Sequence, residues 1–305
     1  MKKIMLKDSS MQLPLIGLGC MRIPALKTKE AVRNLVDAAM DEGITFFDHA
    51  DIYGGGEAES LFGAAVKGIS RDSMIIQTKC GIRPGVCYDF SRDYILQSVE
   101  GSLKRLDMDH LDILLLHRPD ALMEPEEVAE AFDRLEAQGK VRYFGVSNQN
   151  PFQIELLNRY CKNRIILNQL QFSIAHCTAV DSGLNVNISN EAGVMRDGGI
   201  LDYCRLNGIR IQAWSPFQYG MFQGTFLGNE KFPQLNRYIT ELAEKYQVTD
   251  SAIAAAWIMR HPAGIQIIAG STSTQRIQDI AKACTVELTR QEWYGLYMAA
   301  GKQLP

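Results

Sequence analysis

The chain has 305 residues, 46% of them hydrophobic and 22% charged, which is enough apolar material for a large buried core. A net charge of -3 without a Lys/Arg cluster argues against nucleic acid or an anionic membrane as partner, and no apolar run approaches the roughly 20 residues of a membrane helix. The seven cysteines lack a CxxC spacing and the N-terminus lacks a signal-peptide core, so we expect reduced thiols in a cytoplasmic protein.

Eight short apolar or β-branched runs are predicted as strands: 14–18, 44–48, 74–79, 112–116, 141–146, 165–169, 209–214 and 265–269. Most of them lack a polar and apolar alternation, which is typical of parallel strands covered on both faces. Helix-length amphipathic segments lie between them: 28–42, 57–67, 91–105, 125–138, 151–160, 198–207 and 274–283, with an extra pair at 234–247 and 250–260 and a closing helix near 289–300.

The strand and helix order, repeated eight times without a Pro/Gly/Ser-rich linker, predicts the α/β class and a (β/α)8 TIM barrel. We expect one domain over 1–305 rather than a doubly wound sheet with a second domain. The segment 171–198 has no periodicity and is expected as a long loop, which in a compact domain is functional, mobile or a missed element.

In such a barrel the active site forms at the C-terminal strand ends. The predicted strands are followed there by polar or cofactor-suited residues: Gly19 to Met21, Asp48 with Tyr53 beyond it, Lys79, His117, Ser147 and Asn148, Gln169, Trp214 to Pro216 with Ser215 between them, and Gly270 to Thr272 with Ser271 between them. Each residue alone has an ordinary structural explanation, such as capping or core packing. Their joint occurrence at one rim favours a functional site.

Four of these side chains suit the reduction of a carbonyl group. A tyrosine hydroxyl has a pKa of about 10, which a neighbouring Lys79 ammonium would lower by favouring the phenolate. Asp48 would hold Lys79 in place, and His117 would orient a carbonyl oxygen toward Tyr53. Hydride would arrive from a cofactor while Tyr53 delivers a proton to oxygen.

Other residues at the rim suit a dinucleotide. Ser147, Asn148 and Gln169 can hydrogen-bond a carboxamide, and Trp214 offers a flat face for an aromatic ring. Gly270 to Thr272 open a predicted helix, where free N–H groups bind anions, and the Arg276 side chain lies about one turn further on. No GxGxxG motif is present, so a Rossmann fold is not predicted.

The stretch FFDHADIYGGGE permits a second interpretation. Asp48, His49 and Asp51 could ligate a metal in a metal-dependent barrel enzyme, a hydrolase or isomerase. The chain offers no HxH pair or further carboxylates at the other strand ends, so we expect His49 and Asp51 to structure the loop. Gly54 to Gly56 are expected to turn the chain tightly into the helix near Glu57, since glycine tolerates positive φ.

Seven motifs in this order resemble the aldo-keto reductase family: FFDHADIYG, TKCG, DILLLHRPD, GKVRYFGVSN, NQ, WSP and IIAGSTSTQRI. The resemblance extends from about residue 14 to 285 and is strongest to bacterial cytoplasmic oxidoreductases with poorly defined substrates. It implies a catalytic tetrad of Asp48, Tyr53 as proton donor, Lys79 and His117. It also implies NADPH, with NADH as an alternative, bound without a metal along the strand ends by the residues Gly19, Met21, Asp48, Ser147, Asn148, Gln169, Trp214, Ser215, Pro216, Gly270, Ser271, Thr272 and Arg276.

Three residues depart from the family pattern. Met21 and Arg118 stand where many members place tryptophans in the substrate pocket. We expect Arg118 to pair with Asp51, Asp120 or another local carboxylate; the less favoured alternative is a contact with an anionic substrate. Asp279 would repel a 2′-phosphate if it faced one.

The sequence therefore predicts an NADP-dependent carbonyl reductase or alcohol dehydrogenase acting on a small-molecule aldehyde or ketone, with no nucleic-acid or membrane partner. The alternatives are an NADPH-binding redox sensor with little turnover and, after it, the metal-dependent barrel enzyme. The physiological substrate, the favoured direction and the oligomeric state stay open.

Overall fold

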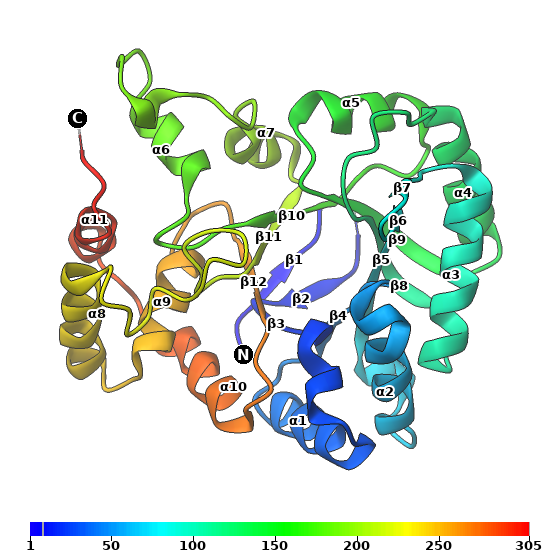
Figure 1. Ribbon diagram of the computed structural model, residues 1–305, viewed down its shortest axis with the longest axis horizontal. Coiled ribbons are helices and arrows are strands. Elements are labelled where there is room, and N and C mark those ends of the chain that lie inside the picture. Colours follow the sequence, from blue (N-terminus) through cyan, green and yellow to red (C-terminus); the bar gives the residue numbers. More distant parts are fainter. Residues whose placement is uncertain (8, 305) are drawn as a thin grey trace.

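The structure, a computed structural model, describes residues 1–7 and 9–304. Eight parallel strands close into a barrel at its centre (Figure 1). In barrel order they are β3 (Ile16–Gly19), β4 (Phe46–Asp48), β5 (Ile75–Cys80), β8 (Leu111–Leu116), β9 (Val141–Ser147), β10 (Leu167–Gln171), β11 (Arg210–Trp214) and β12 (Gln266–Ala269), which pairs with β3 again. The predicted (β/α)8 barrel is confirmed.

Helices surround this barrel at the predicted places. They are α1 (Lys29–Asp41), α2 (Glu57–Ala65), α3 (Arg92–Leu106), α4 (Pro125–Ala137), α5 (Pro151–Tyr160), α7 (Ile200–Asn207), α9 (Asp250–Met259) and α10 (Thr274–Ala281). The helix α5 illustrates a local signal, because Asn150 and Gln153 form a capping box and Pro151 occupies the first turn. Two outer helices, α8 (Pro233–Tyr246) and α11 (Arg290–Ala299), lie on the far side of α9, where Trp257 stacks on Trp293 at a centroid distance of 4.7 Å.

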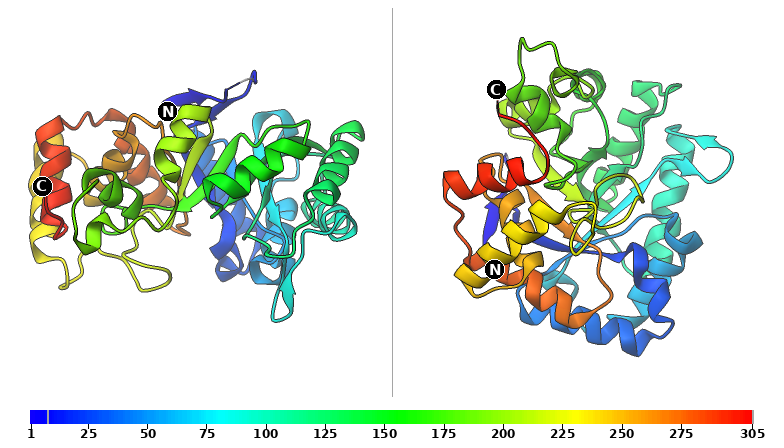
Figure 2. Two further views of the ribbon diagram at one scale, coloured as in Figure 1. Left: turned by 90° about the horizontal axis from the view of Figure 1, so that it is seen from above. Right: turned by 60° about the vertical axis from the view of Figure 1, so that its left-hand side comes forward.

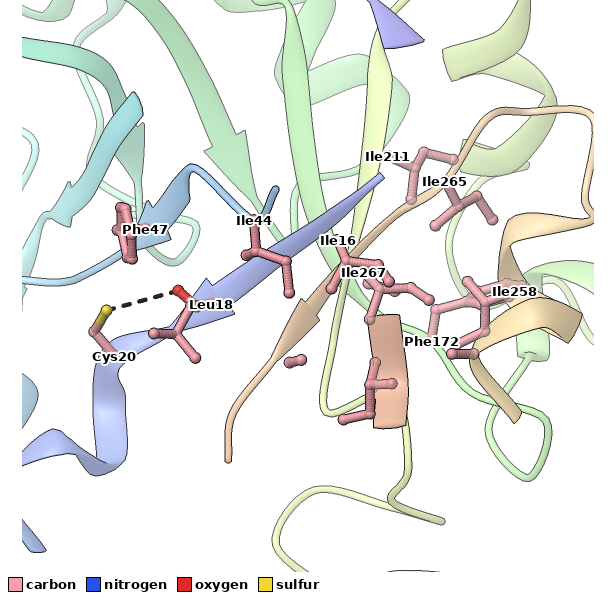
Figure 3. Close-up of a cluster of buried hydrophobic side chains, with 14 of the residues drawn as sticks. Ile16, Leu18, Cys20, Ile44, Phe47, Phe172, Ile211, Ile258, Ile265 and Ile267 are labelled. Carbon is pink, nitrogen blue, oxygen red and sulfur yellow. Dashed lines mark hydrogen bonds between the residues drawn. The ribbon is translucent and has the colours of Figure 1, made fainter. Parts of the chain in front are cut away.

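The main core lies between strands and helices, and the close-up in Figure 3 shows Leu18, Phe47 and Ile267 among its members. A second, smaller cluster of Leu6, Leu13, Phe46, Ile113, Leu115, Leu167 and Ile268 is separate from it. Phe46 and Phe47 belong to different clusters because successive strand side chains point to opposite faces. Gly17 is required beside Phe46, since a Cβ there would meet the ring carbon Cδ1 at 2.7 Å.

Two antiparallel hairpins were not predicted. One joins β1 (Lys3–Met5) to β2 (Gln12–Pro14), so the predicted strand 14–18 divides between β2 and the barrel strand β3. The other joins β6 (Ile82–Arg83) to β7 (Cys87–Tyr88), and Figure 2 shows the two hairpins at opposite ends of the barrel. Strands of two or three residues are too short to carry a periodic signal.

The segment 171–198 also differs from the predicted loop, because it contains α6 (Thr178–Leu184) and a 3-10 turn at Glu191–Gly193. Asp181 of α6 accepts a hydrogen bond from Tyr297 Oη at 2.9 Å and pairs with Lys302. The helix is therefore held by the C-terminal part of the chain. Within the described residues, no helix is long and apolar enough to cross a membrane.

Candidate active site

Four predicted residues meet at the C-terminal ends of three neighbouring strands. Asp48 is the last residue of β4, Lys79 lies in β5, and His117 directly follows β8. Tyr53 follows β4 in a loop that runs along β5, since the backbone N–H of Asp51 donates to the carbonyl of Lys79 at 3.0 Å. The barrel thus brings the four side chains together from positions spread over 70 residues of sequence, from Asp48 to His117.

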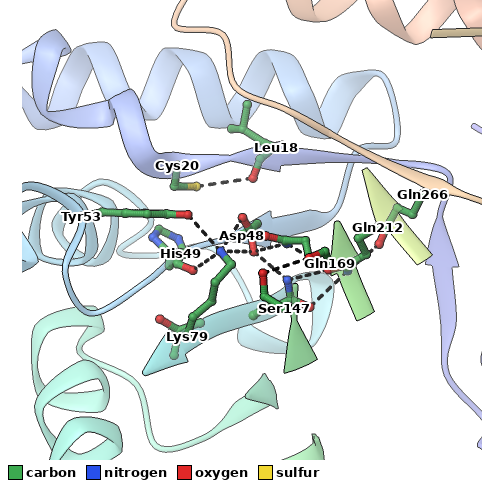
Figure 4. A network of polar contacts seen from close by, with 12 residues as sticks. Leu18, Cys20, Asp48, His49, Tyr53, Lys79, Ser147, Gln169, Gln212 and Gln266 are labelled. Carbon is green, nitrogen blue, oxygen red and sulfur yellow. Dashed lines mark hydrogen bonds and ion pairs between the residues drawn. The ribbon is translucent and has the colours of Figure 1, made fainter. Parts of the chain in front are cut away.

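Lys79 is the centre of the cluster (Figure 4). Its Nζ donates to both Asp48 oxygens at 2.8 Å, to the His49 carbonyl at 2.7 Å and to Tyr53 Oη at 3.1 Å. The Lys79 side chain is fully buried and Asp48 is 3% exposed. A buried ammonium with this many acceptors has one orientation, so it fixes where the Tyr53 hydroxyl lies.

The protonation states follow from burial and charge. Burial alone would lower the pKa of Lys79, but the Asp48 charge together with hydrogen bonds to Asp48 and Tyr53 raises that pKa overall. Burial, the Lys79 charge and the Arg118 charge all lower the pKa of His117 well below 6.5. At neutral pH the site therefore holds a charged lysine and a neutral imidazole.

For Tyr53 the predicted direction was wrong. The Lys79 charge does lower the pKa of Tyr53, but burial acts more strongly in the other direction, so the pKa lies above 10.0. Tyr53 as a residue is half-buried, and its hydroxyl lies beside the buried Lys79 ammonium. The hydroxyl stays protonated at neutral pH, which suits a proton donor.

Three consecutive glycines follow Tyr53 in the sequence. Gly54, Gly55 and Gly56 have φ values of 60°, 64° and 95°, and α2 begins at Glu57 directly after them. A Cβ on Gly56 would meet Arg105 Cδ at 2.7 Å. The predicted glycine turn into the helix is confirmed.

The neighbours of Tyr53 complete the site. The His117 ring stands edge-on to the Tyr53 ring, with centroids 6.0 Å apart and planes at 82°. No described residue hydrogen-bonds the buried Nδ1 of His117. A neutral imidazole here can donate a hydrogen bond to a carbonyl oxygen near Tyr53.

His49 and Asp51 do not join a metal site with Asp48. The His49 ring packs edge-on against Phe62 at a centroid distance of 4.6 Å, and burial and the Lys79 charge lower its pKa to about 3. Burial and the nearby Glu59 charge raise the pKa of Asp51 to about 7. In the described part of the chain, no three His, Cys, Asp or Glu side chains are grouped to hold a metal ion.

The carboxamide candidates lie on or directly after the next strands around the barrel, β9 and β10, and Trp214 ends β11 beside them. Ser147 Oγ donates to the Gln169 carbonyl at 2.9 Å, Asn148 Nδ2 donates to Ser147 Oγ at 2.7 Å, and Trp214 Nε1 donates to Asn148 Oδ1 at 3.1 Å. Gln169 Nε2 donates to Asp48 Oδ1 at 3.1 Å. No described residue donates to Gln169 Oε1, so this atom is available to an incoming amide.

The phosphate candidates lie between β12 and α10. Ser271 Oγ accepts from the Ser273 N–H at 3.1 Å, and Ser273 caps α10 by accepting from the Arg276 N–H at 3.3 Å. The exposed Arg276 side chain has no carboxylate within 4.0 Å among the described residues. Asp279 pairs with Lys282 at 3.5 Å, which offsets the charge expected to repel a phosphate.

The remaining cofactor candidates end or follow the barrel strands β3 and β11. Gly19 ends β3, where an added Cβ would lie 3.0 Å from Ile268 Cγ2 and 3.5 Å from Gly270 Cα, so the ends of β3 and β12 are close. Met21 is exposed in the 3-10 segment Cys20–Leu26. Ser215 has a φ of 48° and begins the loop after β11 together with Pro216.

The expected partner of Arg118 was wrong. Asp120 accepts from the backbone N–H groups of Phe90 and Leu122, both at 2.9 Å, and Asp51 lies with Glu59. The Arg118 guanidinium instead lies over the Trp214 ring, 5.6 Å from its centroid. No carboxylate of the described residues lies within ion-pair distance of it, and the strands β8 and β11 are separated in the barrel by β9 and β10.

Sequence reasoning missed the buried glutamines beneath the site. Gln77 Nε2 donates to Asp48 Oδ1 at 2.6 Å. Gln212 in turn hydrogen-bonds the Gln77 side chain, and Gln266 hydrogen-bonds the Gln212 side chain. Their signal was available, since each glutamine interrupts an apolar strand (IIQTK, IRIQAW, IQIIA), and buried polar groups are almost always hydrogen-bonded.

Known proteins resemble this chain over its whole length. The family model described as Aldo/keto reductase family matches residues 15–296. The 6-dehydroglucose reductase of Agrobacterium fabrum is 35% identical over 319 aligned positions, covering all of both chains, and the Bacillus subtilis oxidoreductase YcsN is 37% identical over 89% of both. The crystal structure of the thermostable aldo-keto reductase Tm1743 with the inhibitor epalrestat superposes with a TM-score of 0.79, at 28% identity, over 98% of this chain and all of that one.

Proposed function

The chain belongs to the aldo/keto reductase family, and from this premise we propose that it reduces an aldehyde or ketone to an alcohol at the expense of NADPH. The observation that carries the proposal is the 3.1 Å contact between Lys79 Nζ and Tyr53 Oη, with the Asp48 carboxylate paired to the same ammonium. This arrangement supplies a proton and stabilises the anion left behind.

The residues around the rim fit a bound dinucleotide. Going around the barrel, the proposed tetrad comes from the ends of β4, β5 and β8 and the segments that follow them. The carboxamide candidates come from the ends of β9 and β10, the Trp214 ring from β11 and the phosphate candidates from the segment after β12. Gln169 Oε1 is well suited to accept a hydrogen bond from the carboxamide of the dinucleotide, and the Arg276 guanidinium is well suited to bind its 2′-phosphate. Ser147, Asn148 and Gln169 would hold the carboxamide, and Ser271, Thr272 and Arg276 the 2′-phosphate.

The proposed reaction uses the tetrad as follows. A bound nicotinamide supplies the hydride that adds to the carbonyl carbon. Tyr53 Oη gives its proton to the carbonyl oxygen, and the C=O group becomes CH–OH. Lys79 stabilises the Tyr53 phenolate, Asp48 holds Lys79, and neutral His117 orients the oxygen by donating a hydrogen bond.

The direct experiment follows the loss of reduced-nicotinamide absorbance with a panel of aldehydes and ketones. We expect turnover with at least one small carbonyl compound, and none when Tyr53 is replaced with phenylalanine. Tight NADPH binding without turnover across the panel would support the redox-sensor alternative instead.

The exposed Arg276 provides a test of cofactor choice. Arg276→Ala should weaken NADPH binding about fivefold to tenfold and leave NADH binding unchanged, because only NADPH carries the 2′-phosphate that the guanidinium would contact. A fluorescence titration with both cofactors measures this. Arg290→Ala, on the outer helix α11, is the matched control and should change neither; an equal loss for both cofactors would contradict the assignment.

The position of Arg118 favours a carbonyl substrate that carries a carboxylate. A guanidinium that lies over the Trp214 ring, without a carboxylate partner among the described residues, can bind an anionic group of a substrate. We expect Arg118→Met, which keeps an apolar stem on the ring, to raise KM about tenfold for an aldehyde with a terminal carboxylate. KM for the chain-matched neutral aldehyde should change less than about twofold. A parallel rise for both substrates would show that Arg118 acts only by packing.

A further inference from the structure

Three buried glutamines form a continuous chain of side-chain contacts inside the barrel. Gln77 of β5, Gln212 of β11 and Gln266 of β12 are all fully buried. Gln77 Nε2 donates to Gln212 Oε1 at 2.9 Å and accepts in return through Oε1 at 3.1 Å. Gln212 Nε2 also donates to Gln266 Oε1 at 2.8 Å, and Gln266 Nε2 donates to the Pro14 carbonyl at 2.7 Å. Figure 4 shows this chain extending from Asp48 through Gln212 to Gln266.

The two ends of the chain fix the orientation of every amide in it. Asp48 and the Pro14 carbonyl can only accept hydrogen bonds, so Gln77 and Gln266 must both present their NH2 groups outward. Gln266 then presents its acceptor Oε1 to Gln212, so Gln212 must donate a hydrogen bond through Nε2. Turning any one amide over would bring two acceptors or two donors together, so the amides have one satisfied arrangement.

This arrangement acts on one oxygen of Asp48. Oδ1 accepts from Lys79 at 2.8 Å, from Gln77 at 2.6 Å and from Gln169 at 3.1 Å, whereas Oδ2 has Lys79 as its only donor among the described residues. Charge-assisted bonds to a carboxylate restrict its rotation and disperse its charge. Lys79 therefore meets a carboxylate that is already held by neutral donors.

We propose that Gln77, supported by Gln212 and Gln266, is a positioning residue that fixes the Asp48 carboxylate and leaves more of the Lys79 charge to act on the Tyr53 hydroxyl. As a statement about catalysis it rests on the proposed function, but its effect on Tyr53 is measurable without turnover. Without the Gln77 donor, the undispersed charge of Asp48 opposes ionisation of Tyr53 more strongly.

The test compares three variants by the ionisation of Tyr53. Gln77→Met keeps the length of the side chain and removes its donor, Gln266→Met breaks the far end of the chain, and Ile113→Val changes packing beside Gln77, with which Ile113 pairs in register. The charged or titratable groups that face Tyr53 are Lys79, Asp48, Cys20 and His117, and none of the variants alters them. Tyrosine labelled with 13C at Cζ, assigned with Tyr53→Phe, reports the ionisation by NMR.

We expect Gln77→Met to raise the pH midpoint at which Tyr53 ionises by about 0.5–1 pH unit. We also expect it to lower kcat about tenfold, with KM changed less than about twofold. Gln266→Met should raise the midpoint of Tyr53 ionisation by a smaller amount. If Gln77→Met does not fold, Gln266→Met alone decides the test. Ile113→Val should leave the ionisation in place. A lower melting temperature with unmoved ionisation in both glutamine variants would overturn the proposal, as would an equal shift in Ile113→Val. A shift in a protein that reduces no carbonyl compound would uphold the positioning role and refute the proposed function.

Discussion

Replacing Tyr53 with phenylalanine is expected to lower kcat for carbonyl reduction by about three orders of magnitude, since a positioned proton donor contributes on the order of 10²–10⁴-fold. The substitution removes only the hydroxyl group. Its 3.1 Å contact with Lys79 Nζ is one of the four hydrogen bonds that the ammonium makes. Lys79 therefore stays anchored by Asp48 and the His49 carbonyl. The fold and the cofactor affinity should be retained.

Steady-state kinetics with the best substrate of the carbonyl panel and an NADPH titration measure this expectation. The control is Tyr88→Phe, which removes the hydroxyl of an exposed tyrosine on the β6–β7 hairpin and should leave kcat unchanged. A Tyr53→Phe enzyme that retains more than about a tenth of the activity would assign the proton to another donor.

Replacing Lys79 with methionine should have the second largest effect, on activity and stability together. Asp48 is buried and would lose the only cation that pairs with it among the described residues, keeping only the Gln77 and Gln169 donors. Breaking a buried ion pair on one side costs about 3–5 kcal/mol, because an uncompensated charge is left inside. The phenolate of Tyr53 would also lose its stabilising charge, so kcat should fall at least about a hundredfold.

Urea unfolding at neutral pH and steady-state kinetics separate the two effects. The double variant Asp48→Asn with Lys79→Met removes both charges and should recover most of the lost free energy of unfolding, but none of the activity. Recovery of activity in the double variant would show that Lys79 serves only to neutralise Asp48.

The sequence predicted the barrel well because its signals are local. The run DILLL has no alternation, as expected for a strand covered on both faces, and Pro125 and Gly139 mark the ends of one helix well. The helix α6 has no comparable signal, since Tyr297 and Lys302 hold its Asp181 from 116 and 121 residues away. Nothing in the neighbouring sequence reports such a contact.

The site was predictable as a set of residues but not in its electrostatics. The motifs placed Asp48, Tyr53, Lys79 and His117 at one rim, where the structure also has them. The net direction of the Tyr53 pKa shift depends on how deeply its hydroxyl is buried, which the sequence does not contain. The conformation of Arg118 depends on a similar feature, because the Asp120 carboxylate already accepts hydrogen bonds from two backbone N–H groups and does not pair with the guanidinium.

The hydrogen bond from Gln266 to the Pro14 carbonyl has a consequence for biosynthesis. The two residues are 252 positions apart, and β12 must pair with β3 before they can meet. A nascent chain emerging N-terminus first cannot make this bond until Gln266 has been translated. If the orientation of Asp48 depends on the glutamine chain, the proposed catalytic geometry cannot form before Gln266 is translated, and chains that end before Gln266 would lack it.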